Sequence, residues 1–430
     1  MAIFDTSAYA QALKIKYGPA LVSQVNDKIV VGKLFQNDKD SWEGSQVQFP
    51  ILTGRGQSFM AHGSLGLLPT AQNETTLSVI IPIKWVRGRV VFEVALMKQS
   101  ARNSGSWARA QQLLMDRLVT NISDEYNRML VSGAGTGILA LVDGGGDDTV
   151  TLAVDAPGGI ASDGFGSRYI QPGMIIAFTN GTLLTAIRTV SAIASETATT
   201  ATLTLDSAVS AAQAPNNYYI VRAADLSVTN ISRDTSYNNE PMGLEGIVDD
   251  GTLVNPFHNV NSTTSPDWAS TRFSVGALSL DALQRLYDAI DQQSGTPPTD
   301  HIVSHSIRRQ YLALQETARV FMQTGKGPQN FDLGQAENKL ALSYNDGPIH
   351  TDRDAQFGQW MSVNKNHLNR YPLVEGEWAD ETGSIFRAVP GQDALEAIWR
   401  AAFNYSTDKR NAHGKLVGMS IANALSRHIS

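Results

Sequence analysis

Residues 104–148 read SGSWARAQQLLMDRLVTNISDEYNRMLVSGAGTGILALVDGGGDD, and this stretch decides the fold that the sequence predicts. In its first part apolar residues recur in steps of four: Ala110, Leu114, Leu118, Ile122, Tyr126 and Leu130. This spacing predicts an amphipathic helix over 104–130, with Ser104 or Ser106 as its cap and Gly133 as its stop signal. About 25 residues at 1.5 Å each give a helix about 40 Å long. Such a helix packs against a sheet and can serve as the spine of an elongated subunit.

The second part of the stretch holds six glycines within residues 131–148. A dinucleotide-binding loop needs a strand before its glycines and a helix after them, and a Walker loop needs Gly-Lys-Ser/Thr. Here a helix precedes the glycines, and no lysine or arginine occurs between Arg128 and Arg168. We therefore expect Gly133, Gly135 and Gly137 to end the helix and to mark a boundary between domains.

Two strand-like segments precede the helix, 45–52 and 75–96, with a polar, glycine-rich link between them. A compact domain rarely holds a structureless loop of this length, so we predict an extended two-stranded flap. A two-stranded ribbon is marginal alone in water, and we expect this one to lie on a neighbouring subunit. The predicted interface residues are the apolar side chains at its tip: Phe59, Met60, Leu65, Leu67 and Leu68.

The chain after the helix predicts a mixture of strands and helices. Between 148 and 223 short strand patterns recur at intervals of about ten residues, which indicates a small β-barrel or sandwich inserted in the chain. Residues 279–293 have the spacing of a helix, and 298–305 is typical of a short buried strand. A helix that Ser306 can cap follows this strand. The fold class is therefore α+β.

Composition narrows the functional classes. The chain has 430 residues and no cysteine, which excludes disulfides, thiolate zinc sites and a cysteine nucleophile. A net charge of −7 argues against a dedicated nucleic-acid binder, because phosphate contacts require a basic surface. We expect neither a signal peptide nor a membrane span, since no suitable apolar run occurs.

The residues that carry chemistry form no recognisable site. His301 and His305 have the spacing of a helical zinc pair, but the segment reads as a strand, in which residues four apart lie about 13 Å from each other. The acidic clusters at 143–148 and 249–250 sit among glycines and lack the spacing of a calcium loop. No G-x-S-x-G sequence occurs. The sequence therefore predicts no catalytic, cofactor-binding or metal-binding residue, and a protein that is not an enzyme.

The order of these segments resembles one family, the major capsid proteins of tailed bacteriophages with the Hong Kong 97-type shell fold. Three local sequences carry the resemblance: IPIKWVRGRVVFEVAL, NRMLVSGAGTGILALVD and DHIVSHSIRRQYLAL. They are similar to the returning flap strand, to the helix end with its glycine-rich turn, and to a strand followed by a helix in that family. The resemblance is architectural and covers nearly the whole chain.

The resemblance implies a division of the chain into domains. It implies an N-terminal arm at 1–40, an extended β-hairpin loop at 41–95 and a C-terminal segment at 401–430. A peripheral domain with the spine helix takes 96–131 and 341–400. An axial domain takes 132–147 and 224–340, and the all-β insertion is 148–223.

The resemblance also implies a function. The chain is expected to be a structural protein that self-assembles, through hexamers and pentamers, into an icosahedral shell around the double-stranded DNA of a tailed phage. Implied partners are scaffolding, portal and cementing proteins and weakly, non-specifically held DNA, with no cofactor and no membrane. The implied location is the virion, after assembly in the host cytoplasm. Alternatives are an encapsulin-type shell, another virion component such as a tail protein, or a nucleotide-handling enzyme.

One departure from the family pattern can be read directly. Some members join their subunits by an isopeptide bond between a loop lysine and an asparagine. Here no lysine occurs between Lys39 and Lys84. We therefore expect non-covalent contacts to stabilise the shell.

Overall fold

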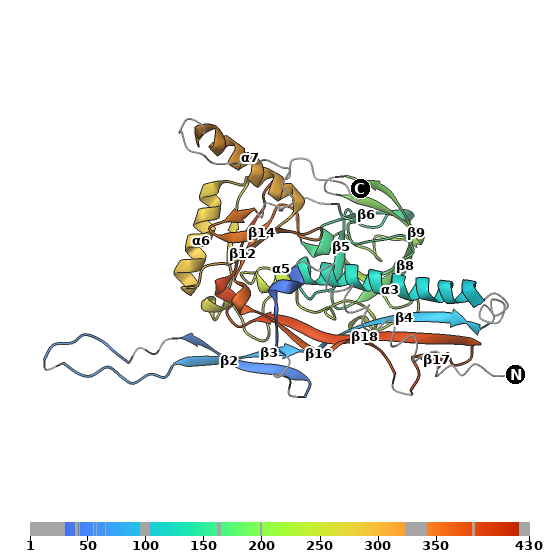
Figure 1. Cartoon of the computed structure of the whole chain (residues 1–430), viewed down its shortest axis with the longest axis horizontal. Coiled ribbons are helices and arrows are strands. Elements are labelled where there is room, and N and C mark those ends of the chain that lie inside the picture. The colour runs from blue at the N-terminus through green and yellow to red at the C-terminus, as the bar shows by residue number, and fades with distance from the viewer. Residues whose placement is uncertain are drawn as a thin grey trace.

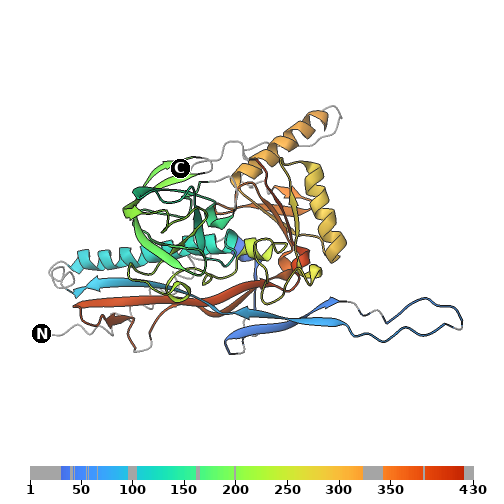
Figure 2. The ribbon, with the colours of Figure 1, turned by 180° about the vertical axis from the view of Figure 1, so that it is seen from behind.

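The structure is a computed structural model that describes residues 31–38, 42, 44–54, 56, 58–64, 66–94, 104–160, 165–197, 200–322, 342–380 and 383–420. The molecule is elongated, as Figure 1 shows. A sheet with a long helix runs along one side, and a narrow ribbon continues past the end of this layer. Two further units, a barrel and a second sheet with helices, lie side by side above it, as the view from behind confirms (Figure 2).

The first sheet is five-stranded, and the long helix α3 packs on it. Its strands are β1 (Gln36–Asn37), β4 (Lys84–Glu93), β16 (Leu368–Trp378), β17 (Phe386–Ala388) and β18 (Ala394–Thr407). The helix spans Ser104–Val131, so the predicted helical range is confirmed. The Tyr126 ring lies 5.9 Å from that of Trp399 and 5.0 Å from that of Phe403, between ring centroids. Leu118, Ile122 and Leu130 belong to the same apolar core as these rings, so the described periodic residues of α3 pack on this sheet.

The ribbon consists of β2 (Gln46–Gly54) and β3 (Thr75–Pro82), which pair antiparallel from Gln46 opposite Pro82 outward. The predicted two-stranded flap is thus present. The intervening chain projects beyond the body as a long open loop (Figure 1).

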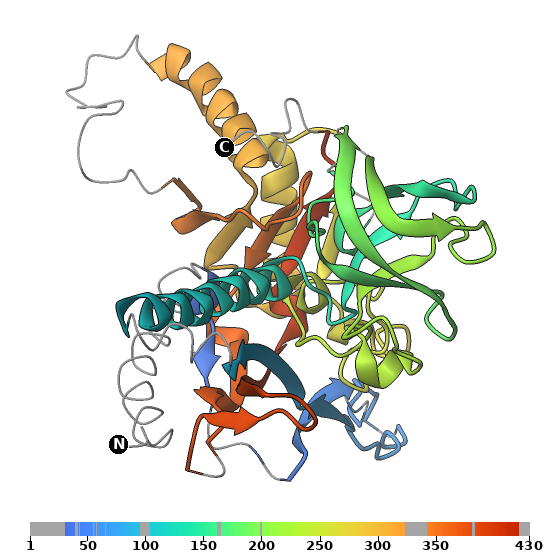
Figure 3. The ribbon, with the colours of Figure 1, turned by 90° about the vertical axis from the view of Figure 1, so that its right-hand side faces the viewer.

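Residues 138–222 form a closed six-stranded barrel in the order β10-β5-β6-β9-β8-β7. The strands are β5 (Ile138–Val142), β6 (Thr149–Asp155), β7 (Ile175–Thr179), β8 (Leu184–Glu196), β9 (Ala201–Val209) and β10 (Tyr219–Arg222). Figure 3 shows the barrel beside the second sheet. Its interior is a separate apolar core that includes Leu139, Val154, Ile176, Phe178 and Leu203, all buried.

The second sheet has six strands in the order β11-β19-β15-β12-β14-β13. They are β11 (Thr271–Ser274), β12 (Asp300–Val303), β13 (Ser343–Tyr344), β14 (Gly347–Thr351), β15 (Trp360–Val363) and β19 (Gly414–Val417). Helices α6 (Leu280–Ser294) and α7 (His305–Met322) accompany it. Ser279 caps α6 through a hydrogen bond from the Ala282 amide. The expectation that Ser306 caps α7 is wrong, because α7 already begins at His305 and Ser306 lies inside it.

Turns and short helices connect these units. The short helices are α4 (Ile231–Asp234), α5 (Leu244–Ile247), η1 (Val31–Leu34), η2 (Pro157–Gly159), η3 (Pro266–Trp268), η4 (Lys365–His367) and η5 (Arg410–Ala412). The connection from Ala223 to Ser270 contains only such short pieces, as its turn-rich sequence predicts.

The sheet pairing divides the chain differently from the predicted ranges. Strand β4 belongs to the first sheet, although 41–95 assigns it to the loop. Strands β13 to β15 and β19 pair in the second sheet, although 341–400 and 401–430 assign them elsewhere. The barrel begins at β5, inside the range 132–147 expected for the axial domain. Periodicity reveals a strand but not its partner, and strand partners here lie as far apart in sequence as Gln36 and Asn369.

Candidate inter-subunit surface

The ribbon has one apolar face that merges with the core of the first sheet. The register places Val47 opposite Ile81, Phe49 opposite Val79 and Ile51 opposite Leu77, so these side chains share a face. Val47, Val79 and Ile81 are buried, while Phe49, Ile51 and Leu77 pack partly against the same core. The ribbon is therefore buried at its root and becomes progressively uncovered toward its tip.

The loop at the tip holds its shape through its own hydrogen bonds. The Ser58 hydroxyl donates to the Gln72 carbonyl oxygen over 2.9 Å and accepts from the Gln72 amide over 2.8 Å. The Gly66 amide donates to the Gly63 carbonyl oxygen over 2.9 Å. The Ser58–Gln72 bonds thus join the two arms of the loop, and the Gly66–Gly63 bond closes a turn within it.

Four of the five predicted interface residues lie exposed on this loop. Their exposed fractions are 83% for Phe59, 57% for Met60, 91% for Leu67 and 81% for Leu68. Leu65 lies outside the described residues. Large apolar side chains gathered on one exposed segment are typical of interaction surfaces, so this loop is a candidate surface for contact with another molecule.

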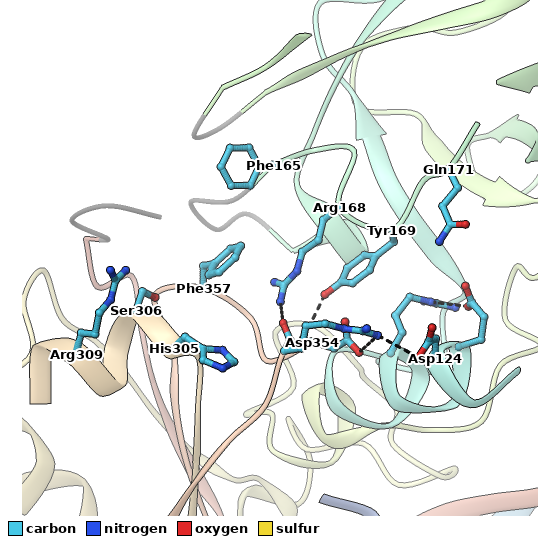
Figure 4. A pocket seen from close by; sticks show the side chains of 13 residues that line it. Asp124, Phe165, Arg168, Tyr169, Gln171, His305, Ser306, Arg309, Asp354 and Phe357 are labelled. Carbon is cyan, nitrogen blue, oxygen red and sulfur yellow. Dashed lines mark hydrogen bonds and ion pairs between the residues drawn. The ribbon is translucent and has the colours of Figure 1, made fainter. Parts of the chain in front are cut away.

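A cavity of about 440 Å³ lies where α3, the barrel and α7 meet, and Figure 4 shows its lining. Arg168 extends from the barrel and donates hydrogen bonds to the carbonyl oxygens of Arg353 and, over 3.0 Å, Ala355. Its guanidinium lies 4.2 Å from the Phe357 ring centroid and 5.3 Å from that of Tyr169. These contacts fasten the barrel to the chain that leads into β15.

Several charged side chains in and beside this cavity are paired with one another. Arg128 contacts Glu125 over 2.9 Å and also Glu240, and Arg222 contacts Glu125 over 2.6 Å. Burial acts to raise the pKa of Glu125, but the charges of Arg128 and Arg222 outweigh it and lower this pKa to about 2. Asn127 donates to both Asp352 and Asp354, over 2.8 and 2.7 Å. The arrangement is that of a structural junction.

The cavity does not assemble a nucleophile with a base among its described residues. The Ser306 hydroxyl is hydrogen-bonded to the Ser304 hydroxyl over 2.9 Å rather than to His305. A Ser–His pair that activates a nucleophile needs a hydrogen bond between the two side chains.

Two of the residues considered as metal ligands, His301 and Asp249, make hydrogen bonds within the protein. His301 is buried on β12, where its Nε2–H donates to the Tyr344 carbonyl oxygen and its Nδ1 accepts from the Ser362 hydroxyl, each over 3.0 Å. Asp249 accepts from the amides of Gly251, Leu253 and Val254 and closes that turn. Over the part of the chain that is described, no three His, Asp or Glu side chains gather in a metal-binding arrangement. Within the same part, no helix is long and apolar enough to span a membrane.

The glycines that follow α3 lie between this helix and the barrel. A Cβ on Gly133 would lie 2.1 Å from the Met129 carbonyl oxygen, and Gly137 has a φ of +70° and borders Ser236. The second glycine group, 144–146, lies within the barrel between β5 and β6, after its first strand rather than before it. The chain passes from helix to strand here, in the reverse order of a phosphate-binding loop.

A buried ion network was not visible in the sequence. The Lys415 ammonium lies 3.0 Å from a Glu245 carboxylate oxygen and 3.7 Å from Asp249, and the Arg410 guanidinium lies 3.8 Å from Asp249. All four side chains are almost completely buried. The network joins the 244–253 segment to β19 and η5. Because these segments are far apart in sequence, no local sequence pattern predicts the network.

No family model and no curated protein matches the chain. Among solved structures, a chain of the cyanophage A-1(L) capsid asymmetric unit is similar with a TM-score of 0.53 and 11% identity, over 91% of this chain and 93% of that chain. The capsid of a native GTA particle has a TM-score of 0.44 and 8% identity, over 91% of each chain. A chain of Mycobacterium phage Bobi has a TM-score of 0.42 and 9% identity, over 91% and 90%. The likeness to the cyanophage chain extends over nearly the whole length of both, so this chain has the fold of that capsid chain.

Proposed function

We propose that this chain is a major capsid protein that self-assembles into the icosahedral DNA-containing shell of a tailed phage. The observation that carries the proposal is the whole-length likeness to the cyanophage capsid chain. The projecting ribbon supports it, because the ribbon buries its root on its own subunit and exposes four large apolar side chains at its tip. The likeness to the capsid chain and the exposed ribbon tip both support a structural role for the chain.

The ribbon tip is the proposed contact with a neighbouring copy. A single exposed leucine is ordinary, but Phe59, Met60, Leu67 and Leu68 lie on one loop that extends away from the body. Burying each such side chain contributes about 1.5–3 kcal/mol. Because a closed shell repeats every contact in all its subunits, a modest gain per contact is enough to hold the lattice.

The two sheets and the barrel take the remaining roles of such a subunit. In this proposal the first sheet with α3 is the peripheral domain and α3 is its spine. The second sheet with α6 and α7 is the axial domain. The barrel is an insertion whose core is independent of both. Hexamers and pentamers of the chain, with scaffolding, portal and cementing proteins, would form the particle around weakly held DNA.

The test compares two sets of loop substitutions. One variant carries serine at Phe59, Met60, Leu67 and Leu68. The matched control carries serine at the exposed loop positions Ala61, Thr70 and Asn73. Negative-stain microscopy and sedimentation measure the fraction of chain in closed particles. We expect the control to form shells and the apolar-to-serine variant to stay dispersed. Shells of normal yield and stability in that variant contradict the role of the loop, and tubes or only dispersed subunits from the unaltered chain contradict the shell itself.

A further inference from the structure

The ribbon joins the body through a short root. Strand β3 ends at Pro82 and β4 begins at Lys84, so a single residue, Ile83, separates the ribbon from the first sheet. Rotation about the backbone of this residue would swing the whole ribbon, because the tip lies far from the root (Figure 1). The ribbon's direction therefore depends on the buried side chains of Val47, Val79 and Ile81 and on the polar contacts near Ile83.

Three hydrogen bonds hold the root, and each goes to a different segment. The Ile80 amide donates to the His258 carbonyl oxygen over 3.0 Å. The Asn404 side-chain amide donates to the Pro82 carbonyl oxygen over 2.7 Å. The Lys84 ammonium donates to the Asn238 carbonyl oxygen over 2.5 Å. Because the three hydrogen bonds go to different segments, together they hold the ribbon in one orientation, which a single hydrogen bond would not do.

Asn404 is built for this position. It is 1% exposed, and its side-chain oxygen accepts the amides of Met242 over 2.8 Å and of Tyr405 over 2.9 Å. Its amide nitrogen is thereby turned toward the Pro82 carbonyl oxygen. Because both ends of the amide are satisfied in a dry site, the orientation of the side chain is fixed.

Lys84 bridges a space that apolar packing does not fill. A groove of about 630 Å³ separates the ribbon root from the segments at 134–136, 238–242 and 253–259, and Lys84 is part of its lining. The ammonium reaches across to the Asn238 carbonyl oxygen, and burial lowers the pKa of Lys84. On this side of the root the direction of the ribbon thus depends on a polar contact.

We propose that Lys84 and Asn404 are positioning residues that set the direction of the ribbon before assembly, so that its tip meets the neighbouring copy. This inference rests on the proposed function for its consequence in assembly, whereas the orientation itself can be measured without it. Loss of a hydrogen bond from a charged donor shifts the balance between the anchored ribbon and other directions by about tenfold or more.

The experiment uses the absence of native cysteine, which lets labels be placed at chosen sites. Nitroxide labels are placed at two exposed positions, Ala71→Cys in the loop and Ala277→Cys on the body. Double electron–electron resonance on dispersed subunits then measures the distribution of distances between the labels, which reports the direction of the ribbon. The test variant is Lys84→Met, which keeps the apolar stem. The matched control is Lys409→Met, because the Lys409 ammonium donates to a backbone carbonyl oxygen, that of Ser294, over 2.6 Å at a site remote from the ribbon.

We expect a single narrow distance peak for the parent and for Lys409→Met, and a broadened, shifted distribution for Lys84→Met with an unchanged thermal midpoint. Lys84→Arg, which keeps a charged donor, should restore much of the narrow peak. Shell yield should fall in Lys84→Met and not in Lys409→Met. An unchanged distance distribution in Lys84→Met overturns the positioning role of Lys84. Asn404→Leu should broaden the distribution as well, and an unchanged distribution in that variant overturns the role of Asn404. A broadened distribution with full shell yield overturns the link to assembly, whereas a parent that never forms shells contradicts the proposed function instead.

Discussion

Replacing Gly137 by alanine tests the close approach of the chain to Ser236 after α3. The φ of Gly137 is +70°, and a Cβ there would lie 1.9 Å from the Ser236 carbonyl oxygen. Gly144 is the matched control, because its φ is +75° but a Cβ there meets nothing within 4 Å. Both substitutions place a side chain in the left-handed region, which costs about 1–2 kcal/mol, and both reduce the freedom of the unfolded chain equally. The difference between their free energies of unfolding therefore measures the clash with Ser236.

The magnitude of that difference follows from the contacts beside Gly137. Since heavy atoms do not approach a Cβ closer than 3.0 Å, the two segments must separate by about 1 Å. Two hydrogen bonds join them: Asn238 amide to Thr136 carbonyl oxygen, 2.8 Å, and Ser236 hydroxyl to Gly137 carbonyl oxygen, 2.7 Å. Weakening both costs about 1 kcal/mol each, so Gly137→Ala should be about 2 kcal/mol less stable than Gly144→Ala.

Scanning calorimetry on dispersed subunits measures the effect, because it reports every unit of the molecule. The barrel strands contain no tryptophan, so tryptophan fluorescence would not follow their unfolding directly. We expect Gly144→Ala to lower the unfolding midpoint slightly and Gly137→Ala to lower it by several degrees more. Equal midpoints for the two variants would refute the steric reasoning.

Three further predictions concern buried charge and the barrel junction. Burial lowers the pKa values of three histidines, to about 3 for His258 and His413 and to about 4 for His301. The unfolded chain takes up these protons near pH 6.5 and the folded chain does not, so stability present above pH 6.5 should be lost as the pH falls toward 4. The loss is about 1.4 kcal/mol per pH unit for each histidine, seen as a falling urea midpoint that His301→Gln makes less steep. Lys415→Met leaves Glu245 buried without its partner and should cost about 3–5 kcal/mol in urea unfolding, while adding Glu245→Gln should recover part of it; no recovery contradicts the charge argument. Arg168→Leu should speed hydrogen exchange in residues 352–357 and leave exchange in β12 unchanged, and equal acceleration in both would point to general destabilisation instead.

The parts of the fold that were predictable are those whose signal is local. The helix α3, the ribbon strands, the strand-rich region of the barrel and the exposed apolar tip are all read from spacing and composition within about thirty residues. The sheet memberships were not predictable in this way. Strand β4 pairs with β18 and β11 pairs with β19, and alternation in one strand carries no information about a partner so far along the chain.

The contacts that position the candidate surface were also beyond sequence reasoning. Lys84 and Asn404 look like ordinary polar residues in strand-like segments, and their roles arise only when β3, β18 and the 238–242 segment meet. The Arg168 contacts have the same character, since an arginine that donates to backbone carbonyl oxygens depends on a fold and not on a motif.

The barrel has its first and last strands as neighbours, since β10 pairs with β5. The chain therefore enters and leaves this unit at adjacent points, and the flanking segments keep the same route whatever lies between them. The segment 138–222 is in this sense an exchangeable cassette. A short linker with adjacent ends would preserve this route, although it would remove the contacts that Arg168 and Arg222 make with the body.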